Sequence, residues 1–280
     1  PEAAFLDCSF SENLADNAGE WERRSRGGAV YITGTFTQPV FANCDFGPNF
    51  VAGVDEDRGG SVYIAAASGV SLEECDFFIP SDFEFPADAL PANGGGVFST
   101  NSDVALTDCT FTNASAQRGG ALYNTADSAY DYTNCTFTNC SAEAGGAIYN
   151  DLNTGELNTR GVLTSCTFTN NQSTGIEDWA GGGAINNFRS SPYLYFCTFT
   201  GNASATDGGA MSNRGVYDNE EGSFPYVEDC MFVENTAEND GGAVYNCENL
   251  GVVDFVRCTF RNNATRSEER RVGKECPSPC

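Results

Sequence analysis

The sequence has no histidine, and its one lysine, Lys274, lies near the C-terminal end. Residues 1–265 hold ten arginines against 36 Asp and Glu residues, which gives this stretch a net charge of −26. So acidic a surface repels nucleic acids and anionic membranes, and it favours solubility, calcium or a salty extracellular setting. Without His or Lys, acid–base catalysis would have to use carboxylates, tyrosine or arginine.

A long apolar run is also missing, so the sequence predicts no direct membrane insertion of this chain. The chain starts at Pro1, inside a repeat and without a charged-then-apolar signal region, and we expect a fragment truncated at both ends. Residues 266–280 are predicted to be a non-native tail, because the stretch from Arg266 to Cys276 resembles one reading frame of a sequencing adapter. The alternative is a genuine charged tail.

A Cys-x-Phe triplet recurs along the rest of the chain. It begins at nine positions, which are Cys8, Cys44, Cys75, Cys109, Cys135, Cys166, Cys197, Cys230 and Cys258. Consecutive triplets are 26 to 36 residues apart, and a Gly-Gly or similar corner lies between them. A unit of this size cannot bury an apolar face alone, so the repeats are expected to stack on one another.

Each repeat is predicted to form three short strands with two corners. The position three residues before each cysteine is always apolar, and a bend is expected between that position and the cysteine. These apolar residues are Phe5, Phe41, Leu72, Leu106, Tyr132, Leu163, Leu194, Val227 and Phe255. In Cys109-Thr110-Phe111-Thr112, Cys and Phe should point inward and Thr outward. The result is an all-β stack of about nine coils over residues 1–265.

The strand after the glycines adds a second buried column and an amide ladder. The aliphatic column consists of Val30, Val62, Val97, Leu122, Ile148, Ile185, Met211 and Val244. Asparagines recur two residues later, at Asn124, Asn150, Asn187, Asn213 and Asn246. Stacked amides can donate to one neighbouring coil and accept from the other. The alternative interpretation is that these asparagines are simply turn residues.

The thirteen cysteines divide into three groups. Nine form the inward column, Cys140 and Cys247 stand apart, and Cys276 and Cys280 belong to the suspect tail. Neighbours in a parallel column have side-by-side Cβ vectors, so we expect mostly buried thiols rather than disulfides. The functional alternative, a metal–thiolate chain, lacks room for tetrahedral ligation among the phenylalanines.

Two recurring motifs carry a family resemblance. Gly-Gly-Ala-aliphatic begins at residues 27, 119, 145, 182 and 241. Phe-x-x-Asn occurs at Phe10/Asn13, Phe46/Asn49, Phe168/Asn171, Phe199/Asn202, Phe232/Asn235 and Phe260/Asn263. Together they resemble the repeat of chlamydial polymorphic outer membrane proteins and, more broadly, the right-handed parallel β-helix group with the pectin-lyase-like fold. Departures are Gly-Gly-Ser at 59, Gly-Gly-Gly at 94, Met211, Ala114 and Cys140.

The resemblance spans residues 5–264 and implies an exported, surface-displayed solenoid for adhesion or recognition. The membrane barrel of that family is absent from this sequence, so the mode of anchorage is open. Six Asn-x-Ser/Thr sequons, at Asn113, Asn134, Asn139, Asn171, Asn202 and Asn263, add slight support for export.

An enzyme is the first alternative. Relatives with the pectin-lyase-like fold that cleave polysaccharides use clustered carboxylates, calcium and a basic residue in a groove along one outer sheet. Charged residues precede several glycine corners here, namely Asp55, Glu56, Asp57 and Arg58, then Glu177 and Asp178, then Asp207, then Asp240. These acids could bind calcium through oxygen ligands. The plainer interpretation is a solvated acidic loop edge, since no spaced calcium-loop motif is present.

A second alternative comes from the outward threonines. The pairs Thr110/Thr112, Thr136/Thr138, Thr167/Thr169 and Thr198/Thr200 predict a two-dimensional array on one sheet. Such an array is similar to those of ice-binding β-solenoids, although threonine also suits any exposed strand.

Our prediction is therefore a single right-handed parallel β-helix that acts as a non-catalytic, extracellular or cell-surface protein. Its expected partners are glycans or proteins at a cell surface, and neither nucleic acid nor a directly inserted membrane. The regular positions all explain structure, so the sequence assigns no catalytic, cofactor-binding or metal-ligating residue, with calcium left open.

Overall fold

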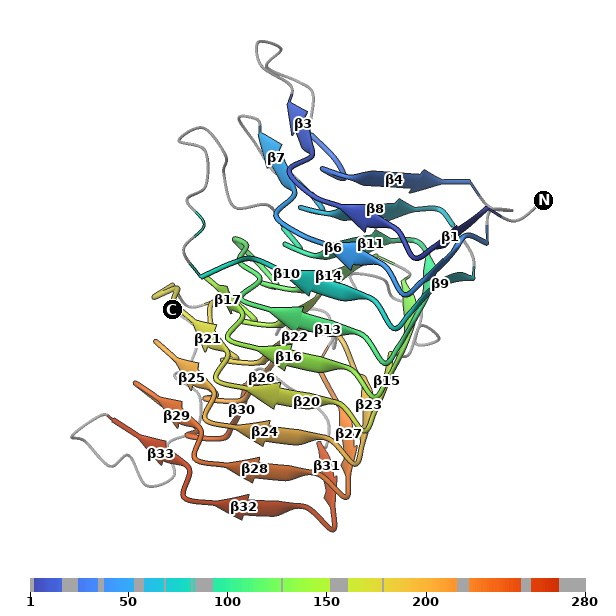
Figure 1. Ribbon diagram of the computed structural model, residues 1–280. Coiled ribbons are helices and arrows are strands. Elements are labelled where there is room, and N and C mark those ends of the chain that lie inside the picture. Colours follow the sequence, from blue (N-terminus) through green and yellow to red (C-terminus); the bar gives the residue numbers. More distant parts are fainter. Residues whose placement is uncertain are drawn as a thin grey trace.

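A computed structural model describes residues 3–16, 25–34, 38–52, 58–67, 69–81, 83, 93–126, 128–151, 161–177, 179–215, 222–247 and 253–266. All regular structure in these ranges is β-strand. Because these ranges hold no helix, they also hold no helix that could cross a membrane. Figure 1 shows the strands as a stack of coils that runs from the blue N-terminal coils to the red C-terminal ones.

Three long parallel sheets form the sides of the stack. The first contains β1 (Ala4–Leu6), β5 (Val40–Ala42), β9 (Val70–Glu73), β12 (Asp103–Thr107), β15 (Ala129–Thr133), β19 (Val162–Thr164), β23 (Tyr193–Tyr195), β27 (Tyr226–Glu228) and β31 (Asp254–Val256). The second contains β2 (Ser9–Phe10), β6 (Asp45–Phe46), β10 (Asp76–Phe78), β13 (Thr110–Thr112), β16 (Thr136–Thr138), β20 (Thr167–Thr169), β24 (Thr198–Thr200), β28 (Met231–Val233) and β32 (Thr259–Arg261). The third contains β4 (Val30–Thr33), β8 (Val62–Ala65), β11 (Val97–Thr100), β14 (Leu122–Thr125), β18 (Ile148–Asp151), β22 (Ile185–Phe188), β26 (Met211–Arg214) and β30 (Val244–Cys247).

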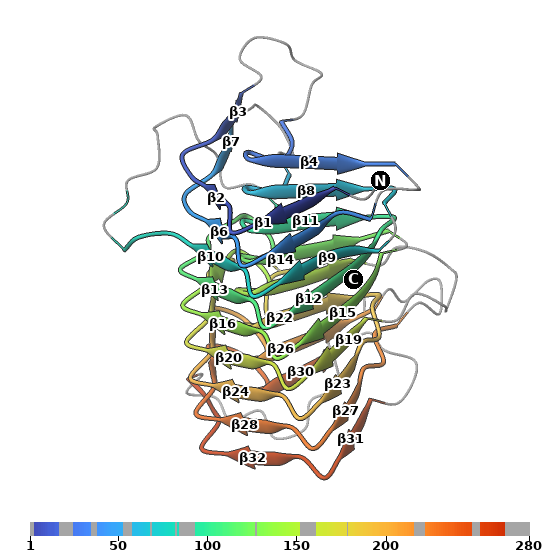
Figure 2. The same cartoon turned by 45° about the vertical axis from the view of Figure 1, so that its right-hand side comes forward.

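Each strand pairs in parallel with its equivalent one coil later. Phe111 is the register partner of Phe137, and Ile148 is the partner of Ile185. The nine strands of the first and second sheets correspond to nine coils, as predicted. In-register parallel coils of this kind define a parallel β-helix, whose coils Figure 2 shows from a second side.

Short strands after the second sheet were not predicted. The fourth sheet contains β17 (Ser141–Ala142), β21 (Gln172–Ser173), β25 (Ala203–Ser204), β29 (Thr236–Ala237) and β33 (Ala264–Thr265), and a fifth pairs β3 (Leu14–Asp16) with β7 (Phe50–Ala52). Most of these strands are only two residues long, too short to show a period in the sequence. They pair because the coils above and below them are already in register.

The bend before each cysteine has a left-handed backbone. The residue preceding each of the nine ladder cysteines has a φ between +51° and +57°. Asp or Asn occupies five of these bends, at Asp7, Asn43, Asp108, Asn134 and Asp229. Asn and Asp tolerate this conformation better than other non-glycine residues. The bend therefore turns the first sheet into the second without a glycine.

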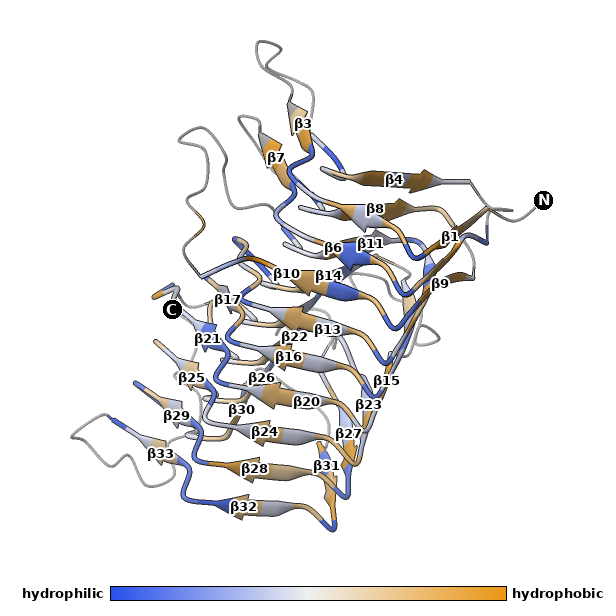
Figure 3. Cartoon of the chain, viewed as in Figure 1, coloured by the Kyte–Doolittle hydropathy of each residue, from blue (hydrophilic) through white to orange (hydrophobic). Residues whose placement is uncertain are grey.

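The core is built from stacked columns. Adjacent rings of the phenylalanine column have centroids 4.4–5.0 Å apart and planes within 2–10° of parallel, from Phe10 to Phe260. The aliphatic column and the ladder cysteines pack against these rings in the same cluster. Figure 3 shows the hydrophobic colour returning at equivalent places in β13, β16 and β20.

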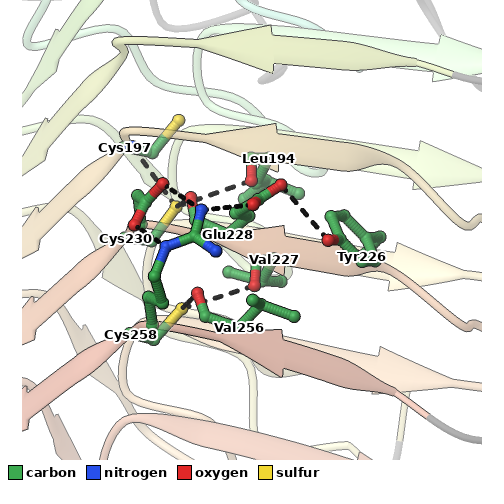
Figure 4. A network of polar contacts seen from close by, with 10 residues as sticks. Leu194, Cys197, Tyr226, Val227, Glu228, Cys230, Val256 and Cys258 are labelled. Carbon is green, nitrogen blue, oxygen red and sulfur yellow. Dashed lines mark hydrogen bonds and ion pairs between the residues drawn. The ribbon is translucent and has the colours of Figure 1, made fainter.

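The cysteine column consists of thiols, as predicted. Ten described cysteines are free, and all but the end members Cys8 and Cys258 are buried. Each thiol from Cys44 onward in the column donates to two backbone carbonyls; Cys109 Sγ, for example, lies 3.4 Å from Thr107 O and 3.3 Å from Leu72 O in the preceding coil. Figure 4 shows the same pattern at Cys230 and Cys258. Cys247, which stands apart from the column, is disulfide-bonded.

Candidate functional site

The outward positions of the third sheet carry a row of aromatic rings. Side chains alternate along a strand, so Ile148 and Asn150 of β18 point into the core while Tyr149 and Asp151 point outward. Tyr149 accordingly belongs to a separate cluster with Tyr63, Phe98 and Tyr123. Neighbouring rings of this row have centroids 5.0–5.3 Å apart. The row therefore extends over several coils on one side of the β-helix.

Arginines of one coil lie over rings of the next. Arg26, Arg58 and Arg118 each precede a glycine corner, and β-bridges link these corner positions from coil to coil. The guanidinium carbons lie 5.3 Å from the Tyr63 ring centroid for Arg26, 5.1 Å from Phe98 for Arg58 and 5.7 Å from Tyr149 for Arg118. These distances are typical of cation–π contacts.

We call this set of residues the arginine–aromatic face; the rings of Tyr63, Phe98, Tyr123 and Tyr149 are covered and only 0–7% exposed. It consists of Arg26, Arg58, Tyr63, Phe98, Arg118, Tyr123, Tyr149, Asp151, Trp179, Asn186, Phe188, Arg189, Arg214 and Tyr245. Within residues 1–265, the described part of the chain contains seven arginines, and five of them belong to this face. The other two, Arg257 and Arg261, lie near the first and second sheets. The scarce cations of an acidic protein are thus concentrated on one side.

Asp151 connects the tyrosines to the arginines. Tyr123 donates its hydroxyl to Asp151 Oδ2 at 3.3 Å, and Arg189 Nη2 lies 3.6 Å from Asp151 Oδ1. Burial raises the pKa of Asp151, although the charge of Arg189 opposes the shift. Burial and the Asp151 charge together raise the pKa of Tyr123 to about 12. The face therefore holds a carboxyl group that is more easily protonated than an exposed one.

Two polar atoms beside Trp179 lack a hydrogen-bond partner among the residues that the structure describes. The Arg118 guanidinium carbon lies 4.6 Å from the Trp179 ring centroid, and Asn186 donates to Trp179 O at 3.3 Å. In the part of the chain that the structure describes, Arg118 Nε and Asn186 Oδ1 are buried without a hydrogen-bond partner. Buried polar atoms are normally paired. Both atoms are shielded from solvent, so neither is a ready contact for a molecule at the surface.

Of the seven acidic residues proposed for calcium, four lie outside the described residues and three lie within them. Asp55, Glu56, Asp57 and Asp178 lie outside the described residues, whereas Arg58 belongs to the arginine–aromatic face. Glu177 is exposed. Asp207 Oδ2 pairs with Arg214 Nη2 at 2.8 Å, and its Oδ1 accepts the Asp240 N–H at 3.1 Å. The Asp207 carboxylate is therefore already engaged in the protein itself.

The described ranges contain no group of three or more Cys, Asp or Glu side chains that could hold a metal ion. Calcium binding at the acidic corners stays a prediction, because most of the carboxylates named for it are not among those residues.

The threonine pairs form the predicted array. Thr110, Thr136, Thr167 and Thr198 are register partners in successive strands, and so are Thr112, Thr138, Thr169 and Thr200. The phenylalanine rings beneath these strands are within 3–7° of parallel, which indicates little twist. The array is bounded by Asp76, which accepts from Thr110 Oγ1 at 2.5 Å, and by Met231.

The Phe-x-x-Asn motif proves to be a second amide ladder. Asn171 Nδ2 donates to Asn202 Oδ1 at 2.9 Å, and the pattern continues to Asn235 and Asn263. The predicted ladder after the glycines is also present, with Asn150 Nδ2 donating to Asn187 Oδ1 at 2.8 Å. Both sets of asparagines thus hold coils together.

This second ladder changes the interpretation of the sequons. Asn171 and Asn202 are fully buried, and Asn263 donates its amide to Phe232 O at 2.9 Å. Asn134 and Asn139 are exposed. Half of the six sequons are therefore ladder positions, and they carry little information about export.

Comparison with known proteins agrees with this architecture. Residues 95–269 match the family model described as "Right handed beta helix region". The chain belongs to this right-handed beta helix family. Searches of curated proteins and of solved structures returned no match. The family match supports the right-handed parallel β-helix, and it leaves the finer resemblance to polymorphic outer membrane proteins as a prediction.

Sequence reasoning missed most of the arginine–aromatic face of this right-handed beta helix. Of its members, Arg58 was noted, but only as one of several charged residues before the glycine corners. The available signal was the recurrence of Arg directly before glycine corners, at Arg26, Arg58 and Arg118.

Proposed function

We propose that this protein is a non-catalytic, extracellular or cell-surface β-helix that recognises glycans through the arginine–aromatic face. One observation carries the proposal: in a strongly acidic chain, five of the seven described arginines of residues 1–265 gather on the face that also holds the outward aromatic rings.

The chemistry of these side chains fits an acidic polysaccharide. Guanidinium groups pair with carboxylate or sulfate groups through two parallel hydrogen bonds. The half-buried ring of Trp179 offers an apolar face beside the Arg118 guanidinium. Because arginine recurs at three of the linked corner positions, Arg26, Arg58 and Arg118, a polymer lying along the stack would meet a guanidinium more than once.

The proposed location and role also draw on the resemblance of the repeat motifs to polymorphic outer membrane proteins. Adhesion at a cell surface is the role that this resemblance implies. A protein ligand with acidic side chains would use the same arginines, so it is the competing partner for this face.

A glycan array with neutral, uronate-containing and sulfated glycans tests the proposal. We expect binding to acidic glycans, lost in Arg118→Ala and retained in Arg261→Ala, which removes an exposed arginine of the second sheet. No glycan cleavage should accompany binding. Failure to bind any glycan, together with capture of a protein ligand that depends on Arg118, would assign the face to protein recognition instead.

Cleavage of polysaccharides is the second candidate function. The observation in its favour is Asp151, a carboxyl group with a raised pKa that lies beside Tyr123 and Arg189. A raised pKa suits a general acid. Release of oligosaccharides from polygalacturonate by the wild type, abolished in Asp151→Asn, would replace the non-catalytic proposal.

Ice binding is the third candidate, favoured by the in-register threonine array. It predicts thermal hysteresis that is lost in Thr136→Lys. Unchanged ice growth in the presence of the wild type removes this candidate.

A further inference from the structure

Three tyrosines cluster on the outer side of the first sheet, away from the arginine–aromatic face. Tyr193 and Tyr195 lie on β23, and Tyr226 is the register partner of Tyr193 on β27. The Tyr193 and Tyr195 rings are 6° from parallel with centroids 6.2 Å apart. The Tyr226 ring lies 5.9 Å and 6.1 Å from them and is inclined at 60° and 54°. All three side chains are half-buried and so remain accessible.

Phe196 adds a more exposed ring at the adjoining bend. Its relative exposure is 59%, and its φ of +57° places a bulky aromatic residue in the left-handed region. The nine equivalent bend positions carry Asp or Asn in five coils, and Phe196 is the apolar member of the set. A bulky residue in this conformation is strained, and strain of this kind is a reason to look for a function.

Charged groups border the aromatic cluster. Tyr226 donates its hydroxyl to Glu228 Oε2 at 3.2 Å, a contact that Figure 4 shows from close by. Arg257 pairs with Glu228, and its Nε donates to Asp229 Oδ1 at 2.8 Å. Phe196 is joined to the same strand, because its N–H donates to Glu228 O at 3.1 Å. The rings and the charged groups thus form one continuous surface.

We propose that Tyr193, Tyr195, Phe196 and Tyr226 form a second binding site, which takes an uncharged oligosaccharide. Aromatic rings stack on the apolar faces of sugars, and Glu228 and Arg257 provide an acceptor and donors at the edge for hydroxyl groups. The one guanidinium is shared between two carboxylates, so the border is negative overall. This charge disfavours the acidic ligands that suit the arginine–aromatic face.

The site does not depend on the proposed function, because it uses a different sheet and a ligand of different charge. Isothermal titration of residues 1–280 with cellohexaose, xylohexaose and chitohexaose tests it. At least one of these should bind, and Tyr226→Ala should weaken binding about tenfold or more. Tyr31→Ala is the matched control, since Tyr31 is an exposed tyrosine on the third sheet. Arg118→Ala should also leave this binding unchanged.

Phe196→Asn separates binding from folding. Asn is favoured at this bend, so the variant should melt about 2 °C higher than the wild type while losing affinity for the oligosaccharide. A purely structural phenylalanine would give lower stability instead. The proposal is overturned if none of the three oligosaccharides binds, or if Tyr226→Ala and Phe196→Asn both bind like the wild type. Concentration-dependent dimers in sedimentation, lost in Phe196→Asn, would assign the patch to a second copy and equally overturn it.

Discussion

Cys140 occupies an asparagine position of the repeat and partly reproduces its hydrogen bonds. Its N–H donates to Asn171 Oδ1 at 2.9 Å, as the N–H of Asn171 does to Asn202. Its thiol lies 3.6 Å from Phe111 O, the carbonyl equivalent to the one that Asn171 Nδ2 reaches at 3.1 Å in the next coil. A thiol is the weaker donor of the two. The rung of the ladder at Cys140 is therefore imperfect.

Cys140→Asn should complete this rung. The new amide would donate to Phe111 O, and its oxygen would lie toward the backbone N–H of Ala114, so we expect the free energy of unfolding to rise by about 1 kcal/mol. Urea denaturation measures the change. Cys135→Asn is the control, because Cys135 packs among the phenylalanines and an amide there should cost about 1–3 kcal/mol. Equal effects of the two variants would contradict the ladder assignment.

The raised pKa of Asp151 predicts how the stability of the protein depends on pH. Because folding raises its pKa, the folded protein binds this proton more readily than the unfolded chain does, and protonation favours folding. The stability of the wild type relative to Asp151→Asn should therefore increase as pH falls from 7 and level off below about 4, the ordinary Asp pKa. Urea midpoints of the two proteins across this range provide the measurement. A relative stability that decreases on acidification would mean that the carboxylate is stabilised by its charge.

The glycine corners allow the backbones of neighbouring coils to approach closely. A Cβ on Gly146 would clash with the backbone carbonyl of Gly183, and it would lie 2.6 Å from Gln172 O, so neither contact can relax by moving a side chain. Gly201 differs, because its Cβ would meet only the side chain of Asn170. Its backbone is left-handed, with a φ of +64°. Asn113 and Asn139 are also left-handed at the equivalent bends, with φ of +56° and +54°.

Gly146→Ala should therefore destabilise the protein by about 2–4 kcal/mol, whereas Gly201→Asn should change stability by less than about 1 kcal/mol. Thermal unfolding followed by far-UV circular dichroism gives both values. A tolerated Gly146→Ala would show that the corners are not stacked as closely as described.

The strands that the sequence predicted are those whose side chains repeat in every coil. Phe137, Ile148 and Asn150 each pack against the equivalent side chains of the coils above and below. Similar residues therefore recur at these positions, and the pattern is visible in the sequence. The two-residue strands such as β17 were missed because their pairing depends on backbone register and not on residue type. The second amide ladder was seen as a motif, but its role needed the distance between Asn171 and Asn202.

In the whole molecule, the position of the arginines distinguishes one face, the arginine–aromatic face, from the others. The arginine–aromatic face was not predicted, because most of its arginine–ring contacts join different coils, as with Arg118 and Tyr149. Spacing along the sequence, which varies from 26 to 36 residues, does not reveal that pairing. The threonine array was predicted, since its members repeat at fixed positions beside Phe. Regular ladders explain the fold, and the departures from regularity mark the candidate sites.

The most direct test of the account is the affinity of the arginine–aromatic face for acidic sugars. Titration calorimetry with galacturonate, alginate and sulfated glycosaminoglycan oligosaccharides at low and high NaCl would compare the wild type with Arg118→Ala. We predict that the wild type binds at least one of them, more weakly as salt increases, and that Arg118→Ala binds it about tenfold more weakly or worse. No binding of any of these sugars, or equal affinity of the two proteins, would contradict the account.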